Sequence, residues 1–317
     1  MRAPAFWDRD GALPRLLTPL GTLYGAATAY RLRRAGLRVD ARVICCGNAT
    51  AGGTGKTILA LAICDLLLAA GRRPAFLTRG YGGRLAGPLR VDPTRHSAAD
   101  VGDEPLLLAA RAPTFVARNR AQSAALARHA TDLILDDGLQ SPDLIKDVSF
   151  LVIDGGAGFG NGRLMPAGPL REPVASAASR ATAAILIGPD LTHAAAALPP
   201  ALPLLRAQLV PKPADLAGSR VLGFAGIGRP EKFRASLARA GAEIVAFAAF
   251  PDHHRYRAAE IAALRTRADE LDARLITTEK DLVRLAPRDR AGIAALGVEL
   301  QFDSPDALAK ILCCGAT

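Results

Sequence analysis

The stretch TAGGTGKT, from Thr50 to Thr57, constrains the fold of this chain more than any other. It fits seven of the eight positions of the phosphate-binding pattern G-x-x-x-x-G-K-[S/T], with Thr50 in place of the first glycine. An apolar run from Val43 to Cys46 precedes it, and a helical pattern begins at Lys56. A strand that leads through such a turn into a helix can surround a phosphate with backbone N–H groups.

This loop predicts a site for ATP with divided roles. Lys56 is expected to reach the β- and γ-phosphates and Thr57 to contact Mg²⁺. The other expected nucleotide contacts come from the loop itself: Thr50, Ala51, Gly52, Gly53, Thr54 and Gly55. The alternative, a glycine-rich turn of some other α/β fold, does not account for the Lys-Thr pair at its end.

The stretch TDLILDDGLQ predicts the acidic strand end that a magnesium nucleotide site requires. The apolar run from Leu133 to Leu135 is followed at once by Asp136 and Asp137. Open parallel sheets bind their ligands at the carboxyl ends of the strands, and in nucleoside triphosphatases an Asp there holds Mg²⁺. One Asp at a strand end is often only a helix cap, whereas two beside a phosphate loop indicate a metal link.

Short apolar runs alternate with helical patterns along most of the chain. Besides those already named, strands are expected at 75–78, 114–117, 150–153 and 183–187, and a helix over 56–70. Such alternation predicts an α/β fold, a P-loop NTPase-like parallel sheet with helices on both faces.

A cluster of prolines between Pro189 and Pro213 favours a connection between two domains. Beyond it the pattern resumes on a smaller scale, with strands at 221–224, 243–250 and 274–277 and helices at 231–240 and 258–271. The predicted organisation is an N-terminal helical segment 1–40, a P-loop domain 41–190, a proline-rich connection 191–217 and a smaller α/β domain 218–317 that closes the cleft.

The N-terminal segment carries much of the positive charge of the chain. Residues 1–42 hold eight Arg and three Asp, which supply +5 of a formal net charge of +10. The charge-free run 16–30 has 15 residues, fewer than the about 20 that a spanning helix needs, and Pro19 and Gly21 interrupt it. It is therefore not expected to cross a bilayer.

The same segment has the pattern of an amphipathic helix. Its apolar residues recur at spacings of three and four: Leu13, Leu16, Leu20, Leu23, Ala27 and Tyr30. Arg31, Arg33 and Arg34 follow directly, as in helices that lie on an anionic membrane surface. Periodicity alone allows equally a helix packed on the core of the protein, and nucleic acid is the competing partner for the charge.

The composition excludes other classes of protein. Half of the residues are hydrophobic and 22% are charged, which indicates a globular chain. Asp8 and Asp10 stand where a secretory signal would carry only positive charge. The five Cys include no C-x-x-C pair and no His at metal-ligand spacing, so neither a disulfide framework nor a zinc site is expected.

Eight motifs in one order cover nearly the whole chain: GNATAGGTGKT, TRGYGG, GDEP, DDGLQ, NGRLMPAGPLREP, GFAGIGRPEKF, FPDHHRY and TTEKDLVRL. In this order they resemble the tetraacyldisaccharide 4'-kinase family of the lipid A pathway. The resemblance implies a kinase that transfers the γ-phosphate of ATP to the 4'-hydroxyl of an acylated glucosamine disaccharide 1-phosphate, giving lipid IVA. It also implies a peripheral protein on the cytoplasmic face of the inner membrane, with no nucleic acid and no obligate protein partner.

The resemblance further implies roles that local sequence does not. Asp103 in GDEP would be the catalytic base, paired with His253 or His254 and acting beside Lys56. Without the family, Asp103 and Glu104 read as an acidic helix start and the two His as a solvated loop.

The remaining implied roles are weaker. Arg171 would face the nucleotide, and Gln140 and Glu172 would contribute to the metal site. Tyr81, Glu104 and Arg120 would contact the disaccharide or its 1-phosphate. A structural role is the alternative for each of Gln140, Arg171, Glu172, Tyr81 and Arg120.

Two residues depart from the family pattern. Ser141 stands where a His usually follows DDGLQ, and Arg229 stands where an Asn usually follows GFAGIG. Two competing functions remain: a partitioning-type ATPase that binds nucleic acid, whose loop carries a Lys where Ala51 stands here, and a nucleotide-switched membrane adaptor.

Overall fold

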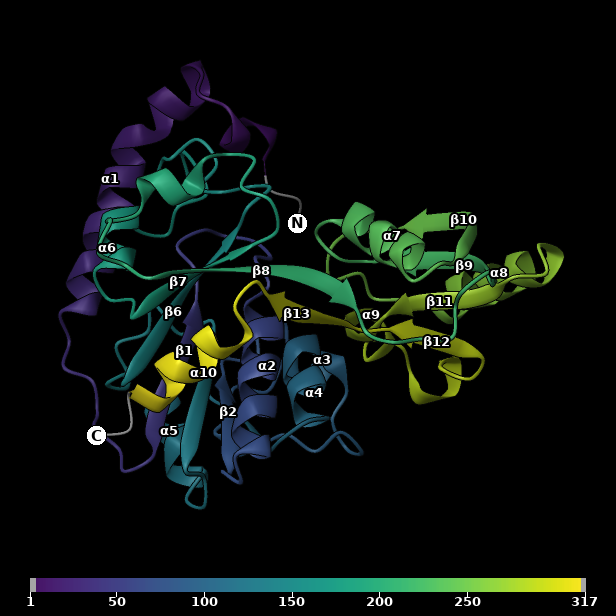
Figure 1. The fold of residues 1–317 in the computed structure, drawn as a ribbon, viewed down its shortest axis with the longest axis horizontal. Helices are drawn as coiled ribbons and strands as arrows, with labels where there is room; N and C mark the ends of the chain where they lie inside the picture. The colour runs from purple at the N-terminus through teal and green to yellow at the C-terminus, as the bar shows by residue number, and fades with distance from the viewer. Residues whose placement is uncertain (1–3, 315–317) are drawn as a thin grey trace.

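The computed structural model describes residues 4–314, which form two α/β units of unequal size (Figure 1). The strands of the larger unit are β1 Arg42–Gly47, β2 Pro74–Thr78, β3 Leu89–Arg90, β4 Thr114–Val116, β5 Asp132–Asp136, β6 Val148–Asp154, β7 Ala183–Ile187, β8 Leu204–Pro211 and β13 Val298–Phe302. Within the described residues they form one nine-stranded sheet, in the order β13-β8-β7-β6-β1-β5-β2-β4-β3. Only its two end pairs, β13 with β8 and β4 with β3, are antiparallel. The expected mostly parallel α/β sheet is confirmed.

The large sheet is buried on both faces because its strand residues alternate between two cores. In β1, Val43 and Cys45 belong to one core, whereas Ile44 and Cys46 belong to the other. The helices of this unit are α1 Ala12–Leu32, α2 Lys56–Ala69, α3 Ala98–Val101, α4 Asp103–Ala109, α5 Arg120–Leu126, α6 Val174–Ala178 and α10 Pro305–Cys314, with 3-10 turns Ala5–Asp8 and Ala194–Ala197. This burial explains why the strands read as continuous apolar runs.

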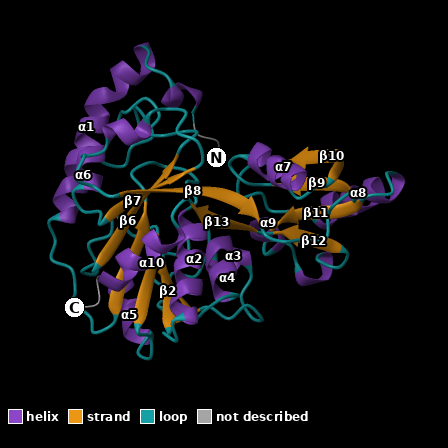
Figure 2. Cartoon of the chain, viewed as in Figure 1, coloured by secondary structure: helices purple, strands orange, loops and turns teal. Residues whose placement is uncertain are grey.

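The smaller unit repeats the same plan with fewer elements (Figure 2). Its parallel strands are β9 Arg220–Ala225, β10 Glu243–Ala249, β11 Arg274–Thr278 and β12 Ile293–Leu296, in the order β10-β9-β11-β12. Its helices are α7 Pro230–Arg239, α8 Ala258–Glu270 and α9 Glu279–Leu282, with a 3-10 turn Pro287–Asp289. Side chains of α7 and of α8 enter separate cores, so the two helices cover opposite faces.

The strands and helices expected from 43 to 187 and from 221 to 277 are present, with ends shifted by a residue or two. The expected domain boundaries need correction. Leu204–Pro211, within the supposed connection, forms β8 of the large sheet, and β13 and α10, within the supposed second domain, return to the larger unit. β8 and β13 run as an antiparallel ribbon toward the smaller unit (Figure 1). Prolines misled the prediction because Pro203 and Pro211 flank or end this strand and do not interrupt it.

Helix α1 lies at the outer margin of the larger unit and docks through its small residues (Figure 1). Gly21 and Gly25 face Leu164 so closely that a Cβ on either would lie within 3 Å of that residue. The opposite stripe, predicted from its periodicity, faces outward: Leu16 is 76% exposed and Leu23 is 68% exposed. The alternative prediction, that this stripe packs on the core of the protein, is therefore wrong. Among the described residues, no helix combines the length and apolar character that crossing a membrane takes.

Candidate active site

The phosphate loop connects β1 to α2 at the carboxyl edge of the large sheet. Thr50 pairs with Leu170 in a short antiparallel bridge, an extended conformation that needs no glycine. Gly52 and Gly55 do need to be glycines, since their φ angles are 125° and 91°. A Cβ on Gly55 would also lie 2.7 Å from Cδ1 of Ile187. The loop therefore departs from the usual pattern only where the backbone tolerates it.

Lys56 and Thr57 begin α2 and face the two acids at the end of β5. The hydroxyl of Thr57 donates to Oδ2 of Asp136 at 3.0 Å. Nζ of Lys56 lies 3.6 Å from Oδ1 of Asp137 and donates to the carbonyl of Gly52 at 3.4 Å. The structure thus brings the loop and the acidic strand end together at one place.

The two acids differ in their electrostatic surroundings. Burial and the negative charges of Glu104 and Asp137 raise the pKa of Asp136 to about 7, despite the opposing charge of Lys56. Burial acts in the same direction on Asp137, but Lys56 and Arg171 outweigh it and hold the pKa of that carboxyl well below its usual range. Nη1 of Arg171 donates to both oxygens of Asp137 at 2.9 Å. Asp137 therefore forms ion pairs with Lys56 and Arg171, whereas among the described residues no cation lies within ion-pair distance of Asp136.

Thr57 and Asp136 fit a Mg²⁺ ion. Oδ1 of Asp136 is buried and has no hydrogen-bond partner among the described residues. Leaving a buried carboxylate oxygen unpaired costs free energy, which a cation would recover. Hydroxyl and carboxylate oxygens are the ligands that Mg²⁺ prefers, usually few in number and completed by water and phosphate.

Asp103 begins α4 and is 5% exposed. Its Oδ1 accepts a hydrogen bond from the backbone N–H of Glu104 at 3.0 Å. Its Oδ2 lies 3.1 Å from Nδ1 of His253, which belongs to the smaller unit. Because an ionised carboxylate only accepts hydrogen bonds, Nδ1 of His253 carries the proton in this pair.

Two cations that sequence reasoning missed also approach this carboxylate. Arg284 donates to Oδ2 of Asp103 through Nε at 2.7 Å and also through Nη2. Lys280 donates to Glu104 at 2.9 Å, and its Nζ lies 3.9 Å from Oδ2 of Asp103. Burial alone would raise the pKa of Asp103. The hydrogen bond from His253 and the charges of Lys280 and Arg284 instead hold that pKa well below its usual range.

The structure distinguishes the two histidines of FPDHHRY. Nε2 of His254 lies 3.0 Å from Oε2 of Glu260, and its ring stacks on Phe250 with centroids 4.8 Å apart. Of the two alternatives, the structure does not bring His254 to Asp103, since its ring contacts Glu260 and Phe250. His253 is the histidine that meets Asp103.

The expected contact of Arg120 with the substrate also needs correction. Arg120 is 1% exposed, and its Nη2 donates to the carbonyls of Asp136 and Asp137 at 2.9 and 2.8 Å. Asp137 has a φ of 54°, a left-handed conformation that is strained for a residue with a side chain. Arg120 therefore holds the turn that carries the two acids.

Replacing Arg120 with Met should lower the free energy of unfolding by roughly 3 kcal/mol, because hydrogen bonds from a charged donor contribute about 1.5–3 kcal/mol each. The KM for the lipid acceptor should stay unchanged. Urea unfolding and initial rates measure the two effects, with the exposed Arg128→Met as the matched control. A stable Arg120→Met variant with a raised acceptor KM would restore the original prediction.

Gln140 is hydrogen-bonded to Glu172 and to the base of the phosphate loop. The side-chain amide of Gln140 donates to the carbonyl of Asn48 at 2.7 Å and to Glu172 at 2.9 Å. Nη2 of Arg180 donates to both oxygens of Glu172, at 2.7 and 2.6 Å. A direct bond from Glu172 to Mg²⁺ would require this carboxylate to leave Arg180, so we assign both residues to support of the loop.

Tyr81 is exposed to solvent beside His253. It is 77% exposed, and its ring meets that of His253 edge-on with centroids 6.0 Å apart. Glu104, also expected at the substrate, accepts from Lys280.

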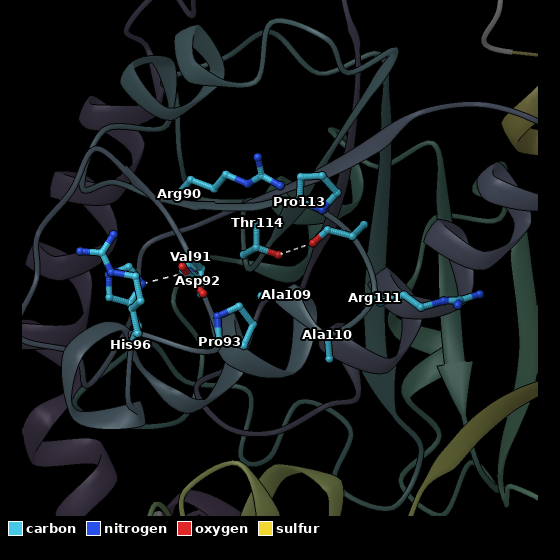
Figure 3. Close-up of a pocket in the computed structure, with 12 residues that line it drawn as sticks. Arg90, Val91, Asp92, Pro93, His96, Ala109, Ala110, Arg111, Pro113 and Thr114 are labelled. Atoms are coloured by element: carbon cyan, nitrogen blue, oxygen red, sulfur yellow. Dashed lines mark hydrogen bonds between the residues drawn. The ribbon is translucent and has the colours of Figure 1, made fainter. Parts of the chain in front are cut away.

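A separate cavity of about 600 Å³ lies at the amino end of β4, where Thr114 begins the strand (Figure 3). Arg90, Asp92 and His96 border it, and none of the predicted site residues is among those that line it. It is distinct from the edge of the sheet that carries the phosphate loop.

A sequence profile of the family described as tetraacyldisaccharide-1-P 4'-kinase matches residues 13–314. The chain belongs to the tetraacyldisaccharide 4'-kinase family. Relatives of that name include one from Methylobacterium radiotolerans, 54% identical over 98% of this chain and 97% of its own length. Another, from Rhodospirillum centenum, is 51% identical over 98% of this chain and 96% of its own.

A solved member of the tetraacyldisaccharide 4'-kinase family has the same fold. The structure of LpxK from Aquifex aeolicus, described as an "apo" form in complex with ATP, matches with a TM-score of 0.79 and 26% identity. The match covers 96% of this chain and 100% of that one. The chain is thus an ATP-dependent kinase of lipid A biosynthesis that phosphorylates the 4'-position of a tetraacyldisaccharide 1-phosphate. Neither a partitioning-type ATPase nor a membrane adaptor is favoured.

Proposed function

We propose that Asp103 is the base of this phosphoryl transfer, that His253 orients it, and that Lys56 neutralises charge on the transferred phosphate. The observation that carries the proposal is the contact between Asp103 and His253 across the two units. Glu104, the next residue along α4, lies near enough to Asp136 to raise its pKa. Asp103 begins α4, and the other end of α4 leads into Thr114, the first residue of the parallel strand β4, so the candidate base lies toward the carboxyl edge of the sheet that carries the phosphate loop.

The chemistry requires little beyond positioning, charge neutralisation and a proton acceptor. The acceptor hydroxyl oxygen forms a bond to the γ-phosphorus while the bond from that phosphorus to the β–γ bridging oxygen breaks. The hydroxyl proton passes to Asp103, and ADP leaves. His253 donates to Asp103 and so keeps its carboxylate oriented.

Thr57 and Asp136 are the residues that would hold Mg²⁺, which when bound would neutralise negative charge on the phosphates. Arg171 and Lys56 keep Asp137 ionised at the edge of this site. Tyr81 and Glu104 are the proposed contacts of the acceptor, because both lie beside the Asp103–His253 pair.

Label transfer tests the proposed reaction. The protein is incubated with γ-labelled ATP, Mg²⁺ and the acylated disaccharide 1-phosphate in detergent, and label is followed into lipid and into free phosphate. Label in lipid, at the 4'-position, is the expected result. Label in free phosphate alone would contradict kinase activity.

We propose that α1 binds the cytoplasmic face of the inner membrane and brings the site to its lipid acceptor. Its outward face carries the stripe of Leu16, Leu20 and Leu23, and Arg31 lies in its last turn. Exposed apolar side chains next to arginines are typical of a helix that lies in an anionic interface. The small residues of its other face keep α1 attached to the protein.

Replacing Leu16 and Leu23 with Ser should lower binding to vesicles of phosphatidylethanolamine and phosphatidylglycerol at least about tenfold, since burying one Leu contributes about 1.5–3 kcal/mol. Co-sedimentation measures the effect. The matched control replaces two exposed leucines outside α1, Leu126 and Leu191, and should leave binding unchanged. Equal binding by the Leu16/Leu23 variant and the unmodified protein would contradict the proposal.

A further inference from the structure

Hydrogen bonds within the smaller unit hold the side chain of Arg284, which also contacts the larger unit. Asp281 is fully buried and accepts hydrogen bonds from the hydroxyls of Tyr256 and Thr278 at 3.0 and 2.7 Å and from the backbone N–H of Gly226 at 3.1 Å. Nη1 of Arg284 donates to Asp281 at 2.7 Å and to the carbonyl of Gly226 at 2.6 Å. All of these partners belong to the smaller unit.

Two nitrogens of the Arg284 guanidinium, Nε and Nη2, contact the larger unit. Nε and Nη2 of Arg284 both donate to Oδ2 of Asp103, and the arginine side chain is only 5% exposed. Nδ1 of His253 approaches the same oxygen. Oδ2 therefore carries three donors, although a carboxylate oxygen has two lone pairs.

The other oxygen of Asp103 is much less engaged. Oδ1 accepts the backbone N–H of Glu104 at 3.0 Å, and that is the hydrogen bond formed at this atom among the described residues. One lone pair of Oδ1 thus remains for a ligand. A carboxylate held by one oxygen can present the other in a fixed direction, and direction governs the rate of proton transfer.

We propose that Arg284 is a positioning residue of the kinase reaction: it anchors Oδ2 of Asp103 when the two units meet, and leaves Oδ1 to receive the proton of the acceptor hydroxyl. This inference rests on the proposed role of Asp103 as the base. The hydrogen bonds of Arg284 go to Asp103 and to its own unit, and its side chain is only 5% exposed, so we assign it an effect through Asp103 and none on the acceptor directly. Lys280, paired with Glu104, balances the second acid of the same helix.

The charged groups around Asp103 set the expected pH dependence. From the smaller unit His253, Lys280 and Arg284 face it, and from its own helix Glu104 does. Arg284 favours the ionised carboxylate, so losing it raises the pKa of Asp103. The reaction needs that ionised form, and the acidic limb of the pH profile of kcat/KM therefore moves to higher pH.

Arg284→Gln should lower kcat about 10- to 100-fold, the scale of a misdirected catalytic group, and should shift the acidic limb upward. ATP affinity, measured by isothermal titration calorimetry, should stay within about threefold, because Arg284 is bonded to Asp103 and to its own unit. The matched control is Arg288→Gln, which removes the same charge from a side chain that is 81% exposed. Arg288→Gln should change neither kcat nor the acidic limb of the pH profile of kcat/KM.

A double-mutant cycle separates positioning from general support of the fold. In an Asp103→Asn background, Arg284→Gln should cost no more than about two- to threefold in kcat, because the group it positions is already lost. If Arg284→Gln lowered kcat in the Asp103→Asn background by the same factor as in the unmodified protein, the inference would be overturned. An unchanged acidic limb of the pH profile in folded Arg284→Gln would also overturn it. If Asp103→Asn itself retains full activity, the assignment of the base fails and the inference with it, an outcome that the single variant reports independently.

Arg284→Lys keeps the test decisive if the glutamine variant does not fold. Lysine keeps the positive charge but has no planar fork to bond Asp281 and Asp103 together. It should leave the acidic limb close to that of the unmodified protein and still lower kcat about 10-fold through lost direction. Full kcat in a folded Arg284→Lys variant would overturn the proposal.

Discussion

Asp103→Asn should lower the turnover of lipid phosphorylation about 10²- to 10⁴-fold, the range typical for loss of a general base. The amide keeps the size of the carboxylate and can still accept the backbone N–H of Glu104. It cannot take up the hydroxyl proton. The ATP dissociation constant should be largely kept, because the hydrogen bonds of Asp103 go to Glu104, His253 and Arg284 and none goes to the phosphate loop.

Two measurements check this result: initial rates of label transfer from γ-labelled ATP into lipid, and isothermal titration with ATP. The control is Asp92→Asn, the same chemical change beside the cavity at the amino end of β4, which should keep turnover within about twofold. Turnover close to that of the unmodified protein in Asp103→Asn would mean that another group accepts the proton.

The parts of the site that could be predicted from the sequence are those formed by neighbours along the chain. The glycine-rich loop, Lys56 and Thr57 are contiguous, and Asp136 follows its own apolar strand. The parallel register of β1 and β5 then brings them together, as the fold class dictates. Local pattern and sheet topology were sufficient there.

Arg284 and Lys280 could not be predicted in the same way. Arg284 meets Asp103 across 181 positions of sequence and across two units, and no local pattern records such a contact. The motif TTEKDLVRL contains both residues, but it does not indicate which residues their side chains contact. Only the packing of α9 beside α4 shows that both cations face the acids of GDEP.

Arg120 and α1 show two further limits of sequence reasoning. The resemblance implied that Arg120 contacts the acceptor, and nothing in the local sequence indicates that this side chain is buried, which is rare for arginine. For α1, periodicity identified the apolar stripe but could not say which face meets the protein. Gly21 and Gly25 decide that, because a close approach to Leu164 requires residues without side chains.

Lys56→Met should lower kcat/KM about 10²- to 10³-fold, as expected when a preorganised charge that stabilises the transition state is removed. Methionine keeps the apolar stem but not the ammonium that lies between Gly52 and Asp137. Lys310→Met on α10, an exposed lysine, is the matched control and should leave the rate constants unchanged.

The separate values of kcat and KM tell what Lys56 does in the reaction. A fall in kcat together with kcat/KM assigns its charge to the transition state, in which the phosphoryl group is transferred. A raised KM for ATP with kcat unchanged would instead limit Lys56 to holding the nucleotide. The first outcome is expected, because the side chain is only 11% exposed and an ammonium in such a place acts with little screening by water.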